Sequence, residues 1–395
     1  MIYIIIGLSL LITIAVVVIL IDIVPTFLTW LSRIHIGRYN DTKIWNKSIT
    51  NVGIKWLNNT PKIKVTDNTR LVVIDMLKGN YSRNTIQHWQ EASLLLGLNE
   101  YLKNNDDEKV KHSIEKFLSS KFNNESQWKD KPKHVDVAIL AYSVMQLDFI
   151  NIDKYKPAFD YIWNLIQGLI GEDGTVRYRS FMNDYRYVDT IGFICPFLVC
   201  YGKRYNKSEC IELSIKQIKE YNKYGILNNH NIPCHAYKIE NKIPMGLYGW
   251  GRGLGWYAIG IIDTWNELEE EDNHKNTLEE FIINFAKSAI EFQHNNGAWS
   301  WTVTRPETRL DSSTTATLSW FMLNASKIDA ISDVCIASYN KAIKYLMRVT
   351  KRNGSIDFSQ GDTKDIGVYS LLFDILPFTQ GFAIRSVNKK SNDLQ

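Results

Sequence analysis

Residues 248–257 read Tyr248-Gly249-Trp250-Gly251-Arg252-Gly253-Leu254-Gly255-Trp256-Tyr257, and an apolar helical pattern runs on from Trp256 to Leu268. Four glycines alternate with Trp, Arg and Leu, so the backbone can approach a ligand closely while two indoles and one guanidinium point outward. These glycines do not satisfy G-x-G-x-x-G and no predicted strand precedes them, which argues against a dinucleotide-binding loop. A glycine-rich turn that leads into the helix is the structural alternative.

Helical periodicity dominates the chain on both sides of this stretch. Strand-like alternation is scarce, and the best short candidates lie at turns such as residues 174–178. Helices are predicted at residues 86–101, 106–118, 135–147, 155–169, 191–201, 211–221, 256–268, 278–292, 315–328, 334–349 and 368–378. The recurrence of helix pairs along roughly 350 residues predicts an all-α toroid of about six hairpins.

The composition describes a folded chain with a balanced charge. The 395 residues include 46 Lys plus Arg and 42 Asp plus Glu, for a formal charge of +4, so no nucleic-acid partner is expected. The 12 Trp, 20 Tyr and 16 Phe exclude a disordered chain. Trp offers a flat apolar face with an N–H, which suits sugar-binding clefts, although packing in a helical core explains an aromatic excess equally well.

The N-terminal 21 residues carry no charge and are long enough to span about 30 Å of hydrocarbon as a helix. No basic residue precedes this stretch and no A-x-A site follows it, which argues against a cleaved signal peptide. Residues 1–24 are therefore predicted to be a retained single-pass transmembrane anchor. The nearby basic residues all follow the anchor: Arg33, Arg38, Lys43 and Lys47. By the positive-inside rule this pattern predicts that the large remaining part lies in the cytoplasm. An exported domain is the alternative.

Two further parts follow the anchor. Residues 25–68 are polar and rich in Asn and Lys, and we expect them to form a juxtamembrane segment and linker. Residues 69–390 are expected to form the helical domain. The five cysteines are odd in number and lack metal-ligand spacing, so neither a disulfide framework nor a zinc site is predicted, and no cofactor is expected. The oligomeric state is left open.

Two aspartates head apolar helices. Asp136 begins the run from Val137 to Tyr142, and Asp189 begins the run from Thr190 to Leu198, 53 residues later. This separation is about one hairpin, so both carboxyl groups can face one cavity. A carboxyl group in a dry, aromatic-lined site has a raised pKa and can serve as a general acid. The structural alternative for each is a capping residue worth about 1 kcal/mol of helix stability.

Several motifs together resemble one enzyme group. Residues 249–256 look like the W-G-R-G-N-G-W signature of the unsaturated glucuronyl and rhamnogalacturonyl hydrolases, glycoside hydrolase families 88 and 105. Asp189-x-x-x-Phe193-x-x-Pro196-Phe197-Leu198 is similar to their D-x-L-F-M-x-x-P-F-L stretch, which contains the catalytic acid/base. Asp136 lies where that group has its second active-site Asp. Further segments resemble the same group in the same order, and together they cover roughly residues 80 to 388: 233–237, 311–316, 359–363 and 380–383.

The resemblance implies an (α/α)6 barrel that acts on oligosaccharides ending in a 4,5-unsaturated uronic acid. It implies that Asp189 protonates C4 of the enol ether and then activates water, without a metal, and that Asp136 tunes that group or positions water. It also implies the substrate-binding residues Trp89, His235, Trp250, Arg252, Trp256 and Thr363. The structural alternatives are a satisfied polar core residue for His235 and a loop-holding role for Arg252.

The chain also departs from the group's pattern. Leu254 replaces the Asn of the glycine-rich signature, Asp311 replaces a Glu, and Thr190-Ile191-Gly192 replaces bulkier residues beside the acid. These changes and the anchor leave three functions open: an unsaturated glycuronyl hydrolase, a membrane-bound glycan-processing protein of a surface-polysaccharide system, or a glycan-binding protein without activity.

Overall fold

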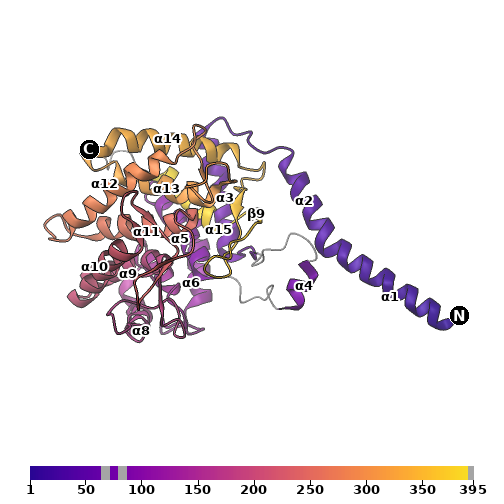
Figure 1. The fold of residues 1–395 in the computed structure, drawn as a ribbon, viewed down its shortest axis with the longest axis horizontal. Coiled ribbons are helices and arrows are strands. Elements are labelled where there is room, and N and C mark those ends of the chain that lie inside the picture. Colours follow the sequence, from indigo (N-terminus) through magenta and orange to yellow (C-terminus); the bar gives the residue numbers. More distant parts are fainter. Residues whose placement is uncertain (64–71, 79–86, 390–395) are drawn as a thin grey trace.

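The computed structural model describes residues 1–63, 72–78 and 87–389, and consists of a helical body from which one long N-terminal helix projects (Figure 1). The helices of the body confirm the predicted all-α class. The expected boundary between residues 68 and 69 and the expected end of the domain at residue 390 lie outside the described residues.

Six helices form a closed inner ring, in which each helix packs against the next and the last packs against the first. α13 is buried along its whole length, as expected for a helix enclosed by neighbours on all sides. The ring contains α5 (His88–Leu102), α7 (Val137–Met145), α9 (Val188–Arg204), α11 (Gly251–Glu267), α13 (Ser312–Ala325) and α15 (Pro377–Asn388).

Amphipathic helices surround this ring, and five of them each follow an inner helix in the chain. Short 3₁₀ turns, η3 (Ile152–Tyr155) and η4 (Asp329–Ile331), precede two of them. The five are α6 (Glu108–Lys121), α8 (Lys156–Gln167), α10 (Ser208–Tyr224), α12 (Lys275–Glu291) and α14 (Ser332–Arg348).

The sixth outer position is filled by α3 (Thr42–Asn58), which packs on α15, α5 and α6. These residues differ from the linker that the sequence predicts for residues 25–68. Their apolar side chains at Trp45, Ile49 and Trp56 recur at helical spacing and are buried, but the many Asn and Lys residues around them hide this stripe. The chain segment after the N-terminal helix therefore closes the toroid.

The second difference concerns residues 368–378, for which the sequence predicts a helix. β8 (Ser359–Gln360) pairs with β9 (Phe373–Asp374), so residues 359–374 form a hairpin, and α15 begins only at Pro377. A proline at the first position of a helix needs no backbone N–H there, which explains why α15 starts at Pro377. We call residues 357–374 the active-site hairpin, because its tip reaches the cavity described below.

The long loops of the barrel lie at the end where the inner helices begin, which we call the loop end. Most connections from an inner helix to the following outer helix are short, whereas each return to the next inner helix takes 15 residues or more. These returns carry short antiparallel pairs: β1 (Tyr185–Tyr187), β4 (Ala236–Lys238) and β5 (Pro244–Met245) in one sheet, β2 (Ile226–Leu227) with β3 (Ile232–Pro233), and β6 (Trp299–Ser300) with β7 (Leu310–Asp311).

Glycines allow α9 and α11 to approach closely just below this end. A Cβ atom added at Gly192 would lie 2.7 Å from the backbone oxygen of Trp256, and one added at Gly260 would collide with Ile191. The absence of a side chain at position 192 thus brings the first turn of α9 against the first turns of α11. Asp189 and Trp256 are placed around one cavity as a result.

The N-terminal helix runs without a break through α1 (Ile2–Val18), the π-helical turn η1 (Ile19–Ile23) and α2 (Val24–Arg33). Within the described residues it is the one helix long and apolar enough to cross a membrane, and its apolar window makes no buried contact with the barrel. A short helix, α4 (Val72–Leu77), contacts η1 (Figure 1).

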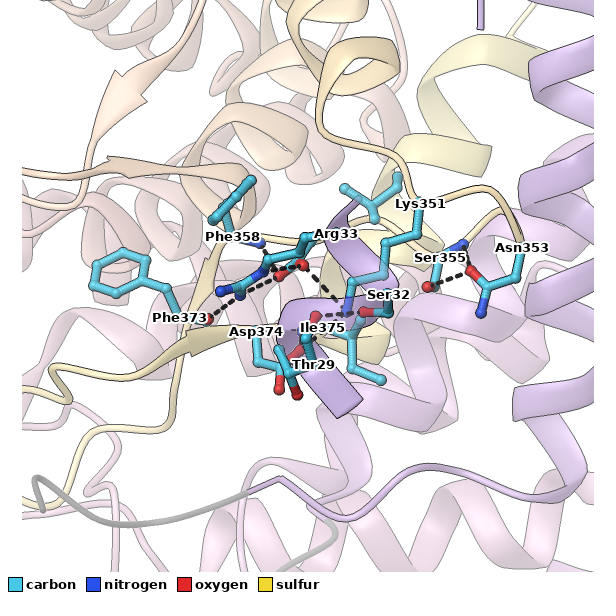
Figure 2. Close-up of polar contacts among 12 residues, drawn as sticks. Thr29, Ser32, Arg33, Lys351, Asn353, Ser355, Phe358, Phe373, Asp374 and Ile375 are labelled. Carbon is cyan, nitrogen blue, oxygen red and sulfur yellow. Dashed lines mark hydrogen bonds and ion pairs between the residues drawn. The ribbon is translucent and has the colours of Figure 1, made fainter. Parts of the chain in front are cut away.

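Arg33, the last residue of α2, fixes this helix to the active-site hairpin (Figure 2). Its guanidinium donates two hydrogen bonds to the buried Asp357 carboxylate at 2.7 and 2.9 Å and a third to the Phe373 carbonyl at 2.8 Å. Lys351 Nζ lies 3.1 Å from the same carboxylate. Although burial alone would raise the pKa of Asp357, the Arg33 hydrogen bond and the Lys351 charge hold it below its usual range. The helix therefore meets the barrel through an ionic contact between a partly buried arginine and a buried aspartate.

Candidate active site

One cavity of about 80 Å³ lies at the loop end, where the first turns of α5, α9 and α11 meet the active-site hairpin. Its floor is aromatic and its walls carry carboxyl, imidazole and guanidinium groups. The lining residues are Gln87, Trp89, Tyr178, Met182, Tyr187, Asp189, Phe193, His235, Trp250, Arg252, Trp256, Asp362, Thr363, Lys364 and Asp365. Seven of the eight residues that the sequence nominates are among them, and the eighth, Asp136, is not.

Asp189 lies in the first turn of α9 and lines the cavity. Its side chain is almost completely buried, and its Oδ2 atom has no hydrogen-bond partner in the protein. Burial raises the pKa of Asp189 to about 7, although its own backbone N–H and the charge of Arg252 act in the opposite direction. The carboxyl group is therefore able to carry a proton near neutral pH and to give it to a group in the cavity.

His235 faces Asp189 across the cavity, with its Nε2 atom 3.8 Å from Asp189 Oδ2. Burial, assisted by the charge of Arg252, lowers the pKa of His235 to about 3, so the imidazole is neutral at pH 7. Its Nδ1 atom lies 3.3 Å from the Tyr369 hydroxyl, and its ring packs against Trp250 with a centroid separation of 4.4 Å. The Nδ1 side of the ring is therefore packed in the core, as the structural alternative predicts, whereas Nε2 faces Asp189 at the cavity.

Asp136 occupies the N-cap position of α7 but makes no capping hydrogen bond. Its Oδ1 atom is buried without a hydrogen-bond partner and lies 3.9 Å from Arg179 Nη1. Burial raises the pKa of Tyr178, and the nearby charges of Asp189, Asp136 and Asp362 add to that effect, with Arg179 opposing it. Asp136 therefore belongs to the electrostatic surroundings of the cavity without lining it.

The tip of the active-site hairpin adds a carboxyl group that the sequence does not single out, Asp362. Gln87 donates a hydrogen bond of 2.6 Å to Asp362 Oδ2, and burial raises the pKa of this carboxyl group against the charge of Arg252. Thr363 lies beside it, with a buried hydroxyl that has no partner. Both residues belong to the segment 359–363 that resembles the hydrolases, which is the signal by which Asp362 could have been found.

Arg252 holds the hairpin in place. Its Nη1 atom donates to the Gln360 carbonyl at 2.9 Å and its Nη2 atom donates to the Gly361 carbonyl, while Trp250 Nε1 donates to Gln360 Oε1 at 3.1 Å. The loop-holding alternative for Arg252 therefore describes its hydrogen bonds, and its charge still acts on Asp189, Asp362 and His235.

The remaining nominated aromatic residues form the floor. Trp256 packs edge to face with Trp89 at 5.6 Å and with Phe193 at 4.5 Å between ring centroids, and Trp89 Nε1 donates to Gln87. Leu254, which replaces the usual Asn, is buried in the core and does not line the cavity. The side chain at this position thus contributes to the core and not to the lining of the cavity.

Asp311, the residue in place of a Glu, has a structural role. Its carboxylate caps α13 by accepting from the backbone N–H groups of Ser313 and Thr314, and it also accepts from the Gln360 N–H at 2.9 Å. It therefore ties the start of α13 to the base of the active-site hairpin.

Other lining residues lacked a sequence signal. Tyr187 is the last residue of β1, and Tyr178, Met182, Lys364 and Asp365 come from loops; all five lie on the long returns at the loop end and reach the cavity because the barrel closes.

Comparison with known proteins agrees with the family resemblance and with the fold. The family model described as Glycosyl Hydrolase Family 88 matches residues 62–369. No curated protein sequence matches the chain. Among solved structures, a protein from Klebsiella pneumoniae described as a possible member of the GH105 family is 16% identical, with a TM-score of 0.73 over 88% of this chain and 92% of that one.

Two further solved structures have the same fold. An unsaturated glucuronyl hydrolase specific for heparin is 14% identical, with a TM-score of 0.68 over 89% of this chain and 97% of its own. An unsaturated glucuronyl hydrolase from Bacillus sp. GL1, responsible for the degradation of glycosaminoglycan, is 13% identical, with a TM-score of 0.66 over 89% and 95%. These likenesses confirm the six-hairpin barrel.

Proposed function

The chain belongs to Glycosyl Hydrolase Family 88, and from this premise we propose that it removes a 4,5-unsaturated uronic acid from the non-reducing end of an oligosaccharide by hydrating the enol ether. The observation that carries the proposal is Asp189, a buried carboxyl group with a pKa of about 7 and an unpartnered oxygen at an aromatic cavity. The interior of the barrel beyond this cavity is filled with side chains, which suits binding of a chain end.

In this mechanism the proton of Asp189 moves to C4, and the C4–C5 double bond supplies the electron pair. Positive charge develops at C5 and is shared with the ring oxygen. Water then adds to C5 and gives a proton to the Asp189 carboxylate, which restores the acid. The hemiketal formed at C5 opens to a ketone, and the hemiacetal left at C1 collapses to an aldehyde and releases the remaining oligosaccharide. One carboxyl group that cycles between acid and base accounts for both proton transfers of the hydration, and in the two later steps each hydroxyl proton ends on the oxygen that departs.

The surrounding residues have supporting roles in this proposal. Neutral His235 has its Nε2 atom available to hydrogen-bond a sugar hydroxyl or the attacking water. The charge of Asp362 disfavours ionisation of Asp189, the charge of Asp136 acts in the same way on Asp362, and negative charge at the cavity stabilises the cation at C5. Thr363 offers an unpartnered hydroxyl, and Trp250 with Trp256 offers apolar surface to the sugar ring.

We also propose that residues 1–24 anchor the enzyme in a membrane and that the barrel faces the cytoplasm. The support is the apolar helix and the basic residues that follow it. A reporter fused after residue 395 should be active when it requires the cytoplasm and inactive when it requires the periplasm. The reverse pattern would place the barrel on the outer side.

The activity is tested with the full-length protein in detergent and several unsaturated disaccharides, by following loss of the ultraviolet absorbance of the enol ether. We expect turnover by the wild type and none by Asp189→Asn, which keeps the shape of the side chain but cannot donate a carboxyl proton. Turnover by this variant would show that Asp189 is not the acid. Tight glycan binding without turnover by the wild type would indicate a glycan-binding protein.

A further inference from the structure

The exposed apolar side chains of the barrel are gathered at one end. Beyond residue 41, ten large apolar side chains are exposed in the described part of the chain, and eight of them lie on loop-end segments. We call these eight the apolar rim: Ile74, Met76, Leu77, Ile170, Phe181, Ile243, Val368 and Leu371. The other two, Ile44 and Val334, lie on outer helices. A soluble barrel has no need to concentrate exposed apolar groups around its cavity.

Several rim residues adjoin segments that line the cavity. Phe181 is 73% exposed and precedes Met182, which lines the cavity. Val368 is joined to the lining residue Lys364 by a backbone hydrogen bond. Ile243 lies in the turn that joins β4 to β5, next to the strand that follows His235. Apolar side chains thus stand at several points around one opening.

The N-terminal helix lies against the same end of the barrel. A groove between α2 and the active-site hairpin is lined by Pro25, Thr29 and Trp30 on one side and by Leu371 and Phe373 on the other. The apolar helix α4, which carries three rim residues, contacts η1. Among the described elements, the N-terminal helix therefore meets two loop-end segments: η1 contacts α4, and α2 lies beside the active-site hairpin.

The length of the helix sets the height of the rim above a membrane. The uncharged stretch ends at Asp22, and about 20 apolar residues fill the hydrocarbon layer. Residues 25 to 30 then lie roughly 5 to 12 Å further along the helix axis, at the depth of the lipid headgroups. Phe27 and Trp30, with ring centroids 5.7 Å apart and both largely exposed, are residue types that favour this depth. α4 contacts residues 19–23 and therefore lies closer to the hydrocarbon layer than residues 25 to 30 do.

The junction at Arg33 prevents the barrel from turning away. Arg33 makes a bidentate contact with the buried Asp357, and the Gly37 N–H donates a bond of 3.0 Å to the Thr350 carbonyl, so the segment that follows α2 is tied to the barrel at two points. Figure 2 shows the contacts of Arg33. Because the same hairpin carries Asp362 and Thr363 at its tip, the orientation of the helix also fixes the direction in which the cavity opens.

We propose that the apolar rim rests on the bilayer that holds the N-terminal helix, so that the cavity opens toward the lipid surface and takes its sugar from a glycan attached to a membrane lipid. This proposal rests on the proposed function for the reaction and on the anchor for the membrane. The partner that covers the apolar rim is the bilayer itself, because the rim adjoins a helix that is long and apolar enough to span a membrane.

Contact with the bilayer is measured without activity. The full-length protein, with Cys200→Ser to remove the one cysteine that is not fully buried, receives a single Cys at position 371 or, as a control, at position 334. Each is labelled with an environment-sensitive fluorophore and reconstituted in phosphatidylcholine vesicles that contain headgroup-nitroxide lipid. We expect strong quenching and a blue shift at position 371, and neither at position 334, which lies at the start of α14 and so at the opposite end of the barrel. Equal responses at both positions would overturn the proposal.

The substrate class is measured with one sugar in two forms. An unsaturated glucuronyl disaccharide is supplied free, or coupled through its reducing end to phosphatidylethanolamine in the vesicles that hold the enzyme. At equal total concentration we expect the lipid-linked form to react on the order of tenfold faster or more, because it shares the surface with the cavity. Equal rates would refute the lipid-linked substrate.

A rim variant separates orientation from catalysis. Phe181→Ser, Ile243→Ser and Leu371→Ser together should lower the rate on the lipid-linked sugar by about fivefold and leave the rate on the free sugar within the error of the wild type, whereas Val334→Ser should change neither rate. An equal loss on both sugars would show that the rim only supports the fold. If neither sugar reacts while position 371 is quenched, the proposed reaction fails and the membrane contact stands.

Discussion

Replacing Asp189 by Asn should abolish activity and at the same time stabilise the protein above neutral pH. The carboxyl group has an ordinary pKa of 3.8 and a pKa of about 7 in the folded protein, because burial penalises its charged form. Between these values the folded protein binds a proton that the unfolded chain has lost, so stability falls as pH rises from about 4 to about 7. Three pKa units at about 1.36 kcal/mol each give a penalty of about 4 kcal/mol at pH 8.

Asn resembles the protonated acid in shape and carries no charge, so the variant escapes this penalty. The expected gain in the free energy of unfolding is about 4 kcal/mol at pH 8 and about 1.5 kcal/mol at pH 5, where the wild-type carboxyl is still protonated when folded. Melting temperatures of the full-length protein in detergent, recorded at both pH values, should differ by several degrees at pH 8 and by less at pH 5.

The same substitution at the exposed Asp148 is the control, because a group in water loses no solvation. The reasoning is refuted if Asp189→Asn changes the melting temperature equally at the two pH values, or lowers it at pH 8. Either result would mean that burial does not disfavour the charged carboxylate, and the argument for Asp189 as the proton donor would lose its physical basis.

Three other outcomes follow from the geometry. The kcat/KM for an unsaturated disaccharide should fall about tenfold per pH unit above pH 7, because Asp189 must hold its proton to react; a flat profile up to pH 9 would contradict this. Arg33→Ala should lower stability by about 2 kcal/mol, since Asp357 stays buried with Lys351 as its remaining cation, and a cycle with Asp357→Asn should show coupling. Gly192→Ala should cost roughly 1–3 kcal/mol by thermal melting, because its Cβ would press on Trp256, whereas the same change at Gly7 on the open face of the N-terminal helix should cost nothing.

The architecture could be predicted from the sequence because the inner helices are apolar over most of their length and their loops carry recognisable motifs. The error at residues 42–58 arises because an outer helix needs only one apolar stripe, and here Trp45, Ile49 and Trp56 stand among Asn and Lys. The error at residues 368–378 has the opposite cause. That segment is apolar enough for a helix, but its backbone bonds go to the other strand of the hairpin.

The candidate site was predictable to the extent that its residues begin helices. Asp189, Trp250 and Arg252 lie at the first turns of α9 and α11, where spacing and motif agree. Asp362 and Gln87 meet through a hydrogen bond between residues 275 positions apart, and this contact exists only once the ring of helices has closed. Which donors of Arg252 face the cavity and which hold the hairpin is likewise a property of the packed structure.

The rigid junction at Arg33 makes the enzyme sensitive to the phase of a helix. Because α2 continues the N-terminal helix and its last side chain is locked to the barrel, each residue inserted between Ile23 and Arg33 would turn the barrel by about 100° around the helix axis and raise it by about 1.5 Å. Insertions of one or two residues would swing the cavity away from its side of the helix, whereas seven residues, close to two full turns, would restore its direction about 10 Å higher. In such a molecule the number of residues in one helix sets both the height of the cavity above the membrane and the direction in which it opens.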